Sequence, residues 1–191
     1  MKKFVSAVAV STMALTLGLS QNAAAQQQGI DLNWGVYAGL VQPLDDLADK
    51  TDLGFDLGVR AITPTPNILP RLSLGGSVDF AYLTGDDNFL DYDVYLVTVK
   101  ALGHYQIPNL PLYAQLGVGT QFWKEEWDGT VTIGIPGFPS TTIRDSGDDD
   151  GTEVGISVGI ALQATPNLEF LLTHESFSYA DDLRLNVVYN F

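Results

Sequence analysis

The residues best suited to binding a metal ion form one acidic run, from Asp145 to Glu153. Several carboxylates and a glycine within so few residues are typical of a calcium-binding loop. The EF-hand spacing nevertheless fails. Aligning Gly151 with the turn glycine of that motif places Ser146 at its first ligand position and Ser157 at its last. We therefore interpret the run as a solvated acidic segment, with loose binding of divalent cations as the alternative, and predict no cofactor and no metal site.

A second candidate for chemistry is the step His174-Glu175-Ser176. In a strand, His174 and Ser176 project from the same face because side chains alternate. The step resembles the His-x-Ser step in the penultimate strand of lipid A 3-O-deacylases, which are small membrane barrels. The resemblance implies that Ser176 is a nucleophile, that His174 is its base, and that an acidic residue orients the histidine.

Two departures weaken this resemblance. Phe177-Ser178 stands where the deacylases have an Asn-Ala step, so the oxyanion donor is missing. The last strand expected carries no acid, which leaves only Asp181 or Asp182 in the connection before it. The favoured interpretation is a histidine and a serine at the rim of a protein that is not an enzyme.

The elements that position these residues begin after a leader. Lys2 and Lys3 precede a mostly apolar stretch, residues 4–19, and three alanines end at Ala25. This pattern predicts a cleaved signal peptide over residues 1–25 and one domain over residues 26–191. No later stretch has 18 continuous apolar residues, so any membrane embedding must use strands.

Charge and cysteine content exclude several classes of function. The chain has 9 basic and 23 acidic residues, and removing the leader gives 7 − 23 = −16. Such a negative charge speaks against nucleic acid as a partner. There is no cysteine, so disulfides, thiol chemistry and a lipoprotein anchor are excluded.

Eight segments alternate between apolar and polar or small residues with the period of a β-strand. In the last one, Leu183 to Phe191, every second residue is apolar. In the fourth, Tyr95 and Val97 facing outward would put Lys100 inside, although a bulge would shift this phase. The segments cover residues 32–40, 53–61, 72–82, 92–105, 112–122, 154–163, 168–177 and 183–191.

The bulky apolar face recurs in nearly every segment, whereas the other face holds Gly, Ser, Gln and a few charges. A soluble carrier barrel has its bulky apolar side chains inside instead. A narrow barrel with an apolar outer face is therefore predicted. Its charged inward residues should meet in an ion-pair network, because an unpaired charge in the lumen is costly. These residues are Asp56, Arg60, Asp79, Lys100, Glu169, Glu175 and Arg184.

The connections between segments alternate in character. Three short ones, which carry no acidic residue, contain a proline followed by Asn67, Asn109 or Asn167, residues suited to tight turns. The other four are longer or acidic. Short turns at one end and long loops at the other are typical of the periplasmic and extracellular ends of an outer-membrane barrel.

The ending, with Phe191 last and Tyr189 two residues earlier, resembles the C-terminal signal strand of bacterial outer-membrane β-barrels. In pattern the whole domain resembles the small eight-stranded proteins of the OmpA transmembrane domain and OmpX type. The resemblance implies an all-β, eight-stranded, antiparallel up-and-down transmembrane barrel in the outer membrane, surrounded by lipid and lipopolysaccharide. It also implies that the barrel assembly machinery reads Tyr189 and Phe191.

The favoured function is a structural or surface-interaction role without a wide pore, because the side chains of an eight-stranded barrel fill its interior. A deacylase-like hydrolase and a narrow small-solute channel are the alternatives. The fifth connection, residues 124–153, is either an ordinary loop or a protruding hairpin that binds an extracellular partner. Its candidate apolar contacts are Ile133, Ile135, Phe138 and Ile143, and the aromatic residues near both ends, Trp123 and Phe177 among them, are interpreted as membrane girdles.

Overall fold

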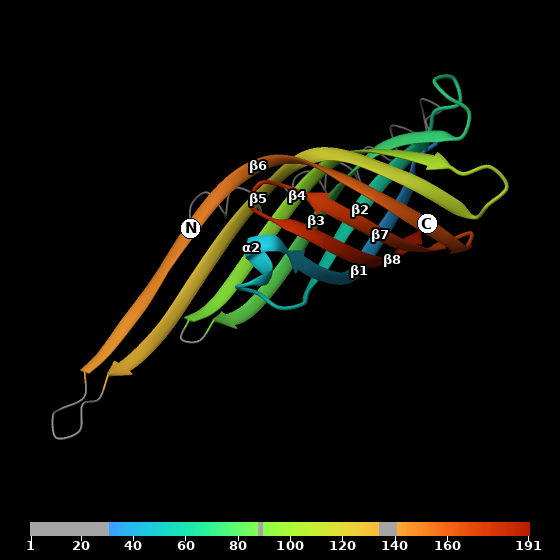
Figure 1. Cartoon of the computed structure of the whole chain (residues 1–191). Coiled ribbons are helices and arrows are strands. Elements are labelled where there is room, and N and C mark those ends of the chain that lie inside the picture. Colours follow the sequence, from blue (N-terminus) through green and yellow to red (C-terminus); the bar gives the residue numbers. More distant parts are fainter. Residues whose placement is uncertain (1–30, 88–89, 134–140) are drawn as a thin grey trace.

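The computed structural model describes residues 31–87, 90–133 and 141–191, whose strands close into one antiparallel barrel (Figure 1). Each strand pairs with the next along the chain, and the last pairs with the first, which confirms the predicted fold class. The expected signal peptide and two of the candidate contacts, Ile135 and Phe138, lie outside the described residues. The elements are β1 (Asn33–Leu44), α2 (Asp45–Ala48), β2 (Gly54–Pro64), β3 (Leu72–Asp87), β4 (Leu90–Gln106), β5 (Leu112–Ile133), β6 (Thr141–Thr165), β7 (Leu168–Ser176) and β8 (Asp181–Asn190).

The period-2 pattern decides which face of each strand points into the barrel. β4 pairs with β3 from Tyr105 to Leu90 without a register shift, so no bulge reverses its phase. Lys100 is consequently buried, while its neighbours Val99 and Ala101 are exposed on the outer face. One register irregularity occurs between β6 and β7, at Gln163 and Thr165.

The outer face of the barrel is apolar and open. On β6, for example, alternate residues from Val154 to Leu162 are between 43% and 71% exposed. Each square ångström of apolar surface left in water costs about 25 cal/mol, so a band of this kind needs a hydrocarbon environment. None of the helical segments described is long and apolar enough to cross a membrane.

We call one end of the barrel the turn end, because the connections 65–71, 107–111 and 166–167 lie there. Both the first residues of β1 and the last of β8 belong to this end, since Gly35 pairs with Asn190. Asn109 adopts a left-handed φ of 63°, which asparagine tolerates better than most residues. The side chain of Asn167 instead donates to the carbonyl of Asn190 (2.8 Å) and so ties the third turn to β8.

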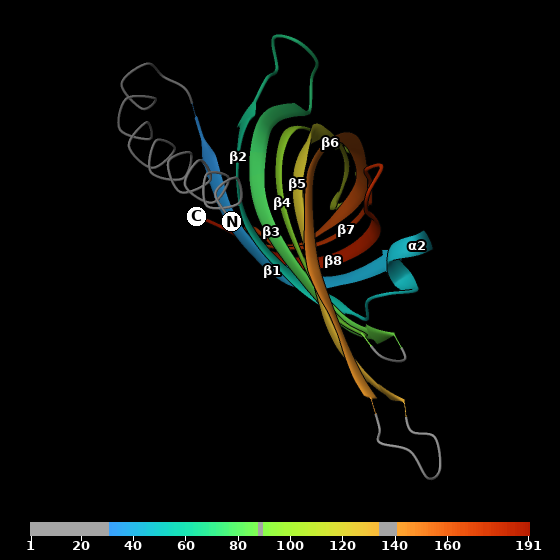
Figure 2. The ribbon, with the colours of Figure 1, turned by 90° about the vertical axis from the view of Figure 1, so that its left-hand side faces the viewer.

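The opposite end, which we call the hairpin end, carries α2 and a long extension of β5 and β6 (Figures 1 and 2). β5 and β6 pair continuously from Leu112 and Leu162 to Ile133 and Thr141. The fifth connection is thus a protruding hairpin and not an ordinary loop. We call its described part, residues 124–133 and 141–153, the flange.

The interior of the hairpin half is apolar, which the sequence pattern did not suggest. Leu47 of α2 packs with inward residues such as Leu83 and Leu96 in a buried cluster. Trp123 and Tyr179 lie against this cluster with their rings stacked 3.8 Å apart and nearly parallel. The girdle interpretation is therefore wrong for Trp123, which faces inward, and for Phe177, which is buried. The buried members of the cluster are Val41, Leu47, Ala81, Leu83, Val94, Leu96 and Ala180.

Candidate functional site

The centre of the lumen is organised by Arg184 of β8. Its Nε donates to Asp182 (2.7 Å), its Nη1 donates to Asp79 (2.8 Å), and the same nitrogen lies 3.4 Å from Asp56. The side chains of all four residues are at most 1% exposed. Arg184 thus stabilises three buried carboxyl groups that approach from strands β2, β3 and β8.

Lys100 of β4 is the second cation of this central network. Its Nζ lies 2.5 Å from Glu175 and 3.1 Å from Asp79, so Asp79 bridges the lysine and the arginine. The hydroxyl of Tyr37 also donates to Asp79 (2.9 Å). The Tyr37 ring lies over Gly58 of the neighbouring strand, where a Cβ would be 2.4 Å from the ring, so glycine makes room for this contact.

A second, smaller network lies nearer the turn end. Arg60 Nη2 donates to Glu169 (2.6 Å) and to the side-chain oxygen of Asn190 (2.9 Å). The amide of Asn190 donates to the other Glu169 oxygen (2.8 Å). Both carboxylate oxygens of Glu169 therefore have a donor.

The structure places all seven charged residues predicted for the lumen inside it, and brings them together in these two networks. The pattern missed Asp182, because this residue seemed to belong to a connection. β8 in fact begins at Asp181, and Asp182 shares the period-2 phase of Arg184. Tyr37 and Asn190 also belong to these networks. Because they are neutral, a search for inward-facing charges could not identify them.

A solute passing through the barrel would have to cross three layers of side chains. The turn-end network, the central network and the apolar cluster follow one another along the barrel, and apart from the half-buried Asn190 their charged and apolar side chains are buried. Gln121 and Thr98, both fully buried, fill space between the central network and the cluster. In the part of the chain that the structure describes, the interior is thus packed, as expected for eight strands, and forms no wide pore.

The hairpin end is closed by contacts among three connections. Tyr179 donates to Glu125 Oε2 (2.7 Å), and Lys50 approaches Glu125 Oε1 (3.0 Å). Lys50 also lies 5.6 Å from the centre of the Tyr92 ring. Burial, followed by the hydrogen bond to Glu125, raises the pKa of Tyr179. The neutral phenol therefore persists as a donor, and it holds the β7–β8 connection to the flange.

His174 and Ser176 lie on the outer face near the hairpin end, as predicted. His174 Nε2 is 3.7 Å from Asp181 Oδ1, and Asp181 pairs directly with Ser176 across β7 and β8. The statement that the terminal strand carries no acid is thus wrong, since Asp181 is the first residue of β8. Among the described residues, Ser176 has no side-chain hydrogen bond to His174, so the nucleophile–base contact is not formed.

The flange is strongly acidic, and acidic residues on neighbouring strands lie directly beside one another. Asp93, Glu126 and Asp148 are direct neighbours across β4, β5 and β6. Arg144 donates to Asp128 (3.0 Å), and this hydrogen bond lowers the pKa of the Asp128 carboxyl. Within the described ranges, no three His, Asp or Glu side chains are arranged to hold a metal ion.

The terminal strand presents its aromatic residues on the outer face. Tyr189 is 53% exposed and Phe191 is 63% exposed. The backbone N–H of Phe191 donates to the carbonyl of Trp34 (2.9 Å), which closes the barrel at the turn end. The backbone of Phe191 is thus held by β1, while its side chain packs little against the barrel.

Comparisons with known proteins agree with this architecture. The family model of the outer membrane protein beta-barrel domain matches residues 11–191. A search of curated proteins found no match. Among solved structures, Neisserial surface protein A is similar with a TM-score of 0.52 and 14% identity, over 84% of this chain and 97% of that one.

Two further structures have lower scores. Ail, the attachment invasion locus protein of Yersinia pestis, is 16% identical over 85% of this chain and 97% of its own, with a TM-score of 0.49. The N-terminal β-barrel domain of Pseudomonas aeruginosa OprF is 14% identical over 83% of this chain and 97% of its own, with a TM-score of 0.45. With a closed barrel, an apolar outer band and a family match over nearly the whole sequence, the chain belongs to the outer membrane protein β-barrel domain family and is an integral protein of the cell outer membrane.

Proposed function

We propose that this barrel is a membrane anchor for the flange, and that the flange binds an extended segment of an extracellular partner along the free edge of β6. The observation that carries the proposal is the pairing of β6. It pairs with β5 along its whole length, but β7 joins its other side only from Ile156 onward. Among the described strands, therefore, none pairs with the second edge of residues 141–155.

A free strand edge presents backbone N–H and C=O groups that a second strand can use. Addition of a strand to such an edge is a common way of recognising extended peptides. Neisserial surface protein A shares the fold of this chain, and its description as a surface protein supports a role at the cell surface. The short turns of outer-membrane barrels are periplasmic, which supports an extracellular position for the hairpin end.

The charge of the edge indicates the kind of partner. Residues 144–153 of β6 contain one arginine and five acidic residues. Like charges directly opposite each other destabilise paired strands, so two copies of this edge would repel each other. A partner strand rich in lysine or arginine would instead gain favourable contacts and a faster association.

The test uses the folded protein in lipid nanodiscs and two fluorescent peptides. One peptide alternates lysine and valine, and the other alternates lysine and proline, so that both have equal charge but only the first can form a strand. We expect the lysine–valine peptide to bind at least about tenfold more tightly in an anisotropy titration, a difference of about 1.4 kcal/mol. Equal binding of the two peptides would show charge attraction without strand addition and would contradict the proposal.

A matched pair of variants locates the site. The triple change Asp145→Asn, Asp148→Asn and Asp149→Asn removes three charges from the edge, and should weaken the lysine–valine peptide. The triple change Asp45→Asn, Asp46→Asn and Asp49→Asn removes three charges at the same end, in α2 and at its C-terminus, and should leave binding nearly unchanged. The proposal is wrong if both triples weaken binding equally.

A second candidate function rests on the pair His174 and Asp181. Their 3.7 Å separation supplies the acid that the deacylase resemblance requires. If the protein were such a hydrolase, lipid A from cells that make it would lose an acyl chain, and His174→Ala would restore the full mass. Because Ser176 lacks a hydrogen bond to the histidine, we expect the lipid A mass spectrum to be identical with wild type, with H174A and without the protein.

We further propose that Tyr189 and Phe191 act in assembly and contribute little to the finished barrel. Both side chains are more than half exposed, so their removal costs few packing contacts. Deleting Phe191 should lower the amount of inserted protein in cells. The molecules that insert should keep nearly normal heat resistance in a gel-mobility assay. Wild-type yield after the deletion would argue against a role of this residue in assembly.

A further inference from the structure

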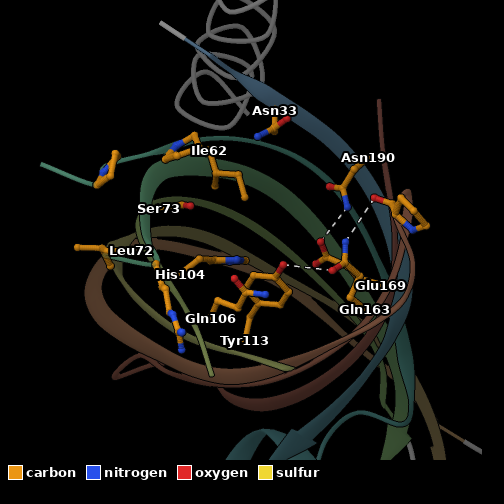
Figure 3. Close-up of a pocket in the computed structure, with 14 residues that line it drawn as sticks. Asn33, Ile62, Leu72, Ser73, His104, Gln106, Tyr113, Gln163, Glu169 and Asn190 are labelled. Atoms are coloured by element: carbon orange, nitrogen blue, oxygen red, sulfur yellow. Dashed lines mark hydrogen bonds between the residues drawn. The ribbon is translucent and has the colours of Figure 1, made fainter. Parts of the chain in front are cut away.

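The turn end contains a cavity that none of the functions discussed above uses. Its volume is about 380 Å³, and residues of all eight strands or their turns line it (Figure 3). This volume lies at the small end of the range of about 300–1,000 Å³ found for ligand pockets. In the orientation proposed above, the turn end is periplasmic, so a ligand would enter the cavity from the periplasm.

We propose that this cavity binds a neutral saccharide about the size of a disaccharide. Four of its lining side chains are amides, those of Asn33, Gln106, Gln163 and Asn190. Each amide offers both donors and an acceptor, which a sugar hydroxyl needs because it donates and accepts at once. Amides are therefore better suited to neighbouring hydroxyl groups than purely basic or purely acidic side chains.

An aromatic ring accompanies the amides. Tyr113 lines the cavity, and its ring centre lies 6.4 Å from that of His104, which is also in the lining. The face of an aromatic ring carries partial negative charge and attracts the C–H groups on one side of a sugar ring. Figure 3 shows Tyr113 and His104 among the amide side chains that surround the same space.

Several of these side chains are held in place before any ligand arrives. His104 Nε2 lies 2.5 Å from Gln115 Oε1, and the Tyr113 hydroxyl donates to Gln163 (3.2 Å). Glu169 is fixed by Arg60 and Asn190 through both of its oxygens. Fixed side chains lose less conformational entropy on binding, so the lining is suited to a weak, uncharged ligand.

The charges of the lining residues favour a neutral ligand over an ionic one. It includes one carboxylate, Glu169, which Arg60 already neutralises, and one cation, Arg71, on an exposed turn. The rest of the chain is strongly acidic, with a formal charge of −14 overall. The cavity therefore has neither the paired carboxylates that would attract a cation nor the basic cluster that a phosphorylated ligand would require.

The residues at the rim of the cavity favour a sugar over an extended peptide as the ligand. Three of the lining residues are prolines, Pro64, Pro66 and Pro166. Proline has no backbone N–H, so the rim cannot provide the row of backbone donors on which strand-like peptide binding depends. The turn-end network closes the cavity on the inner side, so a bound sugar would stay there and would not pass through the barrel.

The test is a titration followed by nuclear magnetic resonance in phosphocholine micelles, because detergents with sugar head groups would compete. The probes are cellobiose, the dipeptide Ala-Ala and glucose 6-phosphate. We expect cellobiose to cause saturable shifts of backbone amides near residues 104–106, 163 and 190, and none in the flange. No saturable shift, or tighter binding of the dipeptide or the phosphate, would overturn the proposal.

Two variants sharpen this test. Gln106→Leu removes an exposed lining amide at nearly constant volume and should weaken cellobiose by about tenfold, or about 1.4 kcal/mol. Gln42→Leu makes the same change at the hairpin end of β1 and should have no effect. Equal affinity of both variants would exclude the cavity as the site. Because the flange lies at the other end of the barrel, this result is independent of the peptide test above.

Discussion

Replacing Arg184 with alanine should destabilise the folded barrel by about 3–5 kcal/mol, the range observed when one partner of a buried ion network is removed. The change leaves Asp182, Asp79 and Asp56 without their main cation, and all three are buried. Lys100 remains near Asp79 but does not reach the other two. The expected measurement is a lower urea midpoint for unfolding from lipid vesicles, followed by the gel shift of the folded form.

Two controls separate charge from packing. Arg144→Ala removes the same side chain from an exposed ion pair with Asp128 and should leave the urea midpoint almost unchanged, because exposed pairs contribute little. Arg184→Met keeps most of the side-chain volume and should be nearly as unstable as Arg184→Ala. If the methionine variant were as stable as wild type, a lost contact and not a stranded charge would explain the alanine result.

The second large effect is expected at Val158, in the middle of the apolar outer face of β6. Val158→Arg should cost about 2–4 kcal/mol, since a charged side chain near the bilayer midplane is costly in a transmembrane barrel. The side chain is 45% exposed, so an arginine would fit without a steric clash. The cost would therefore come from the surrounding lipid.

A series along the same face tests this explanation. Val154→Arg lies nearer the hairpin end and should cost only about 0–1 kcal/mol, as expected near a membrane interface. Ile156→Arg should be intermediate. Equal costs at all three positions would mean that depth in the bilayer does not matter, and that the assignment of this face to lipid is wrong.

The neighbouring position, Ser157, faces the lumen. From the alternation alone, Ser157→Arg is expected to be less damaging than Val158→Arg if the lumen has room or an acidic partner. The structure leaves no room, because Ser157 is 1% exposed and its Oγ lies 2.3 Å from where a Cβ on Gly117 would stand. Ser157→Arg is therefore expected to prevent folding, for steric reasons rather than because of lipid.

Much of the barrel could be predicted because period-2 alternation fixes the face of every residue once the outside is known to be apolar. Arg60, Lys100 and Arg184 were assigned to the lumen in this way, without any knowledge of their partners. The partners could not be assigned, because Arg60 and Glu169 are 109 residues apart and only the closure of the sheet brings them together.

The parts that escaped prediction lie beyond the lipid band. There the outer face of a strand no longer needs to be apolar, so the alternation that marks a strand disappears. After Phe122 the sequence therefore leaves an ordinary loop and a protruding hairpin as alternatives, and inward residues such as Leu83 and Leu96 could not be recognised as a plug. α2 has only four residues, too few for a helical pattern.

In the orientation proposed above, the length of β6 determines how far the protein reaches from the cell. The strand has 25 residues, and crossing the bilayer takes about 9–11 of them. The remaining residues, at about 3.3 Å each, extend roughly 50 Å along the strand. The upper flange should therefore rise above the lipid head groups and into the sugar layer outside them. A large soluble molecule approaching the bacterium would meet β5 and β6 first, while the barrel below stays hidden from it.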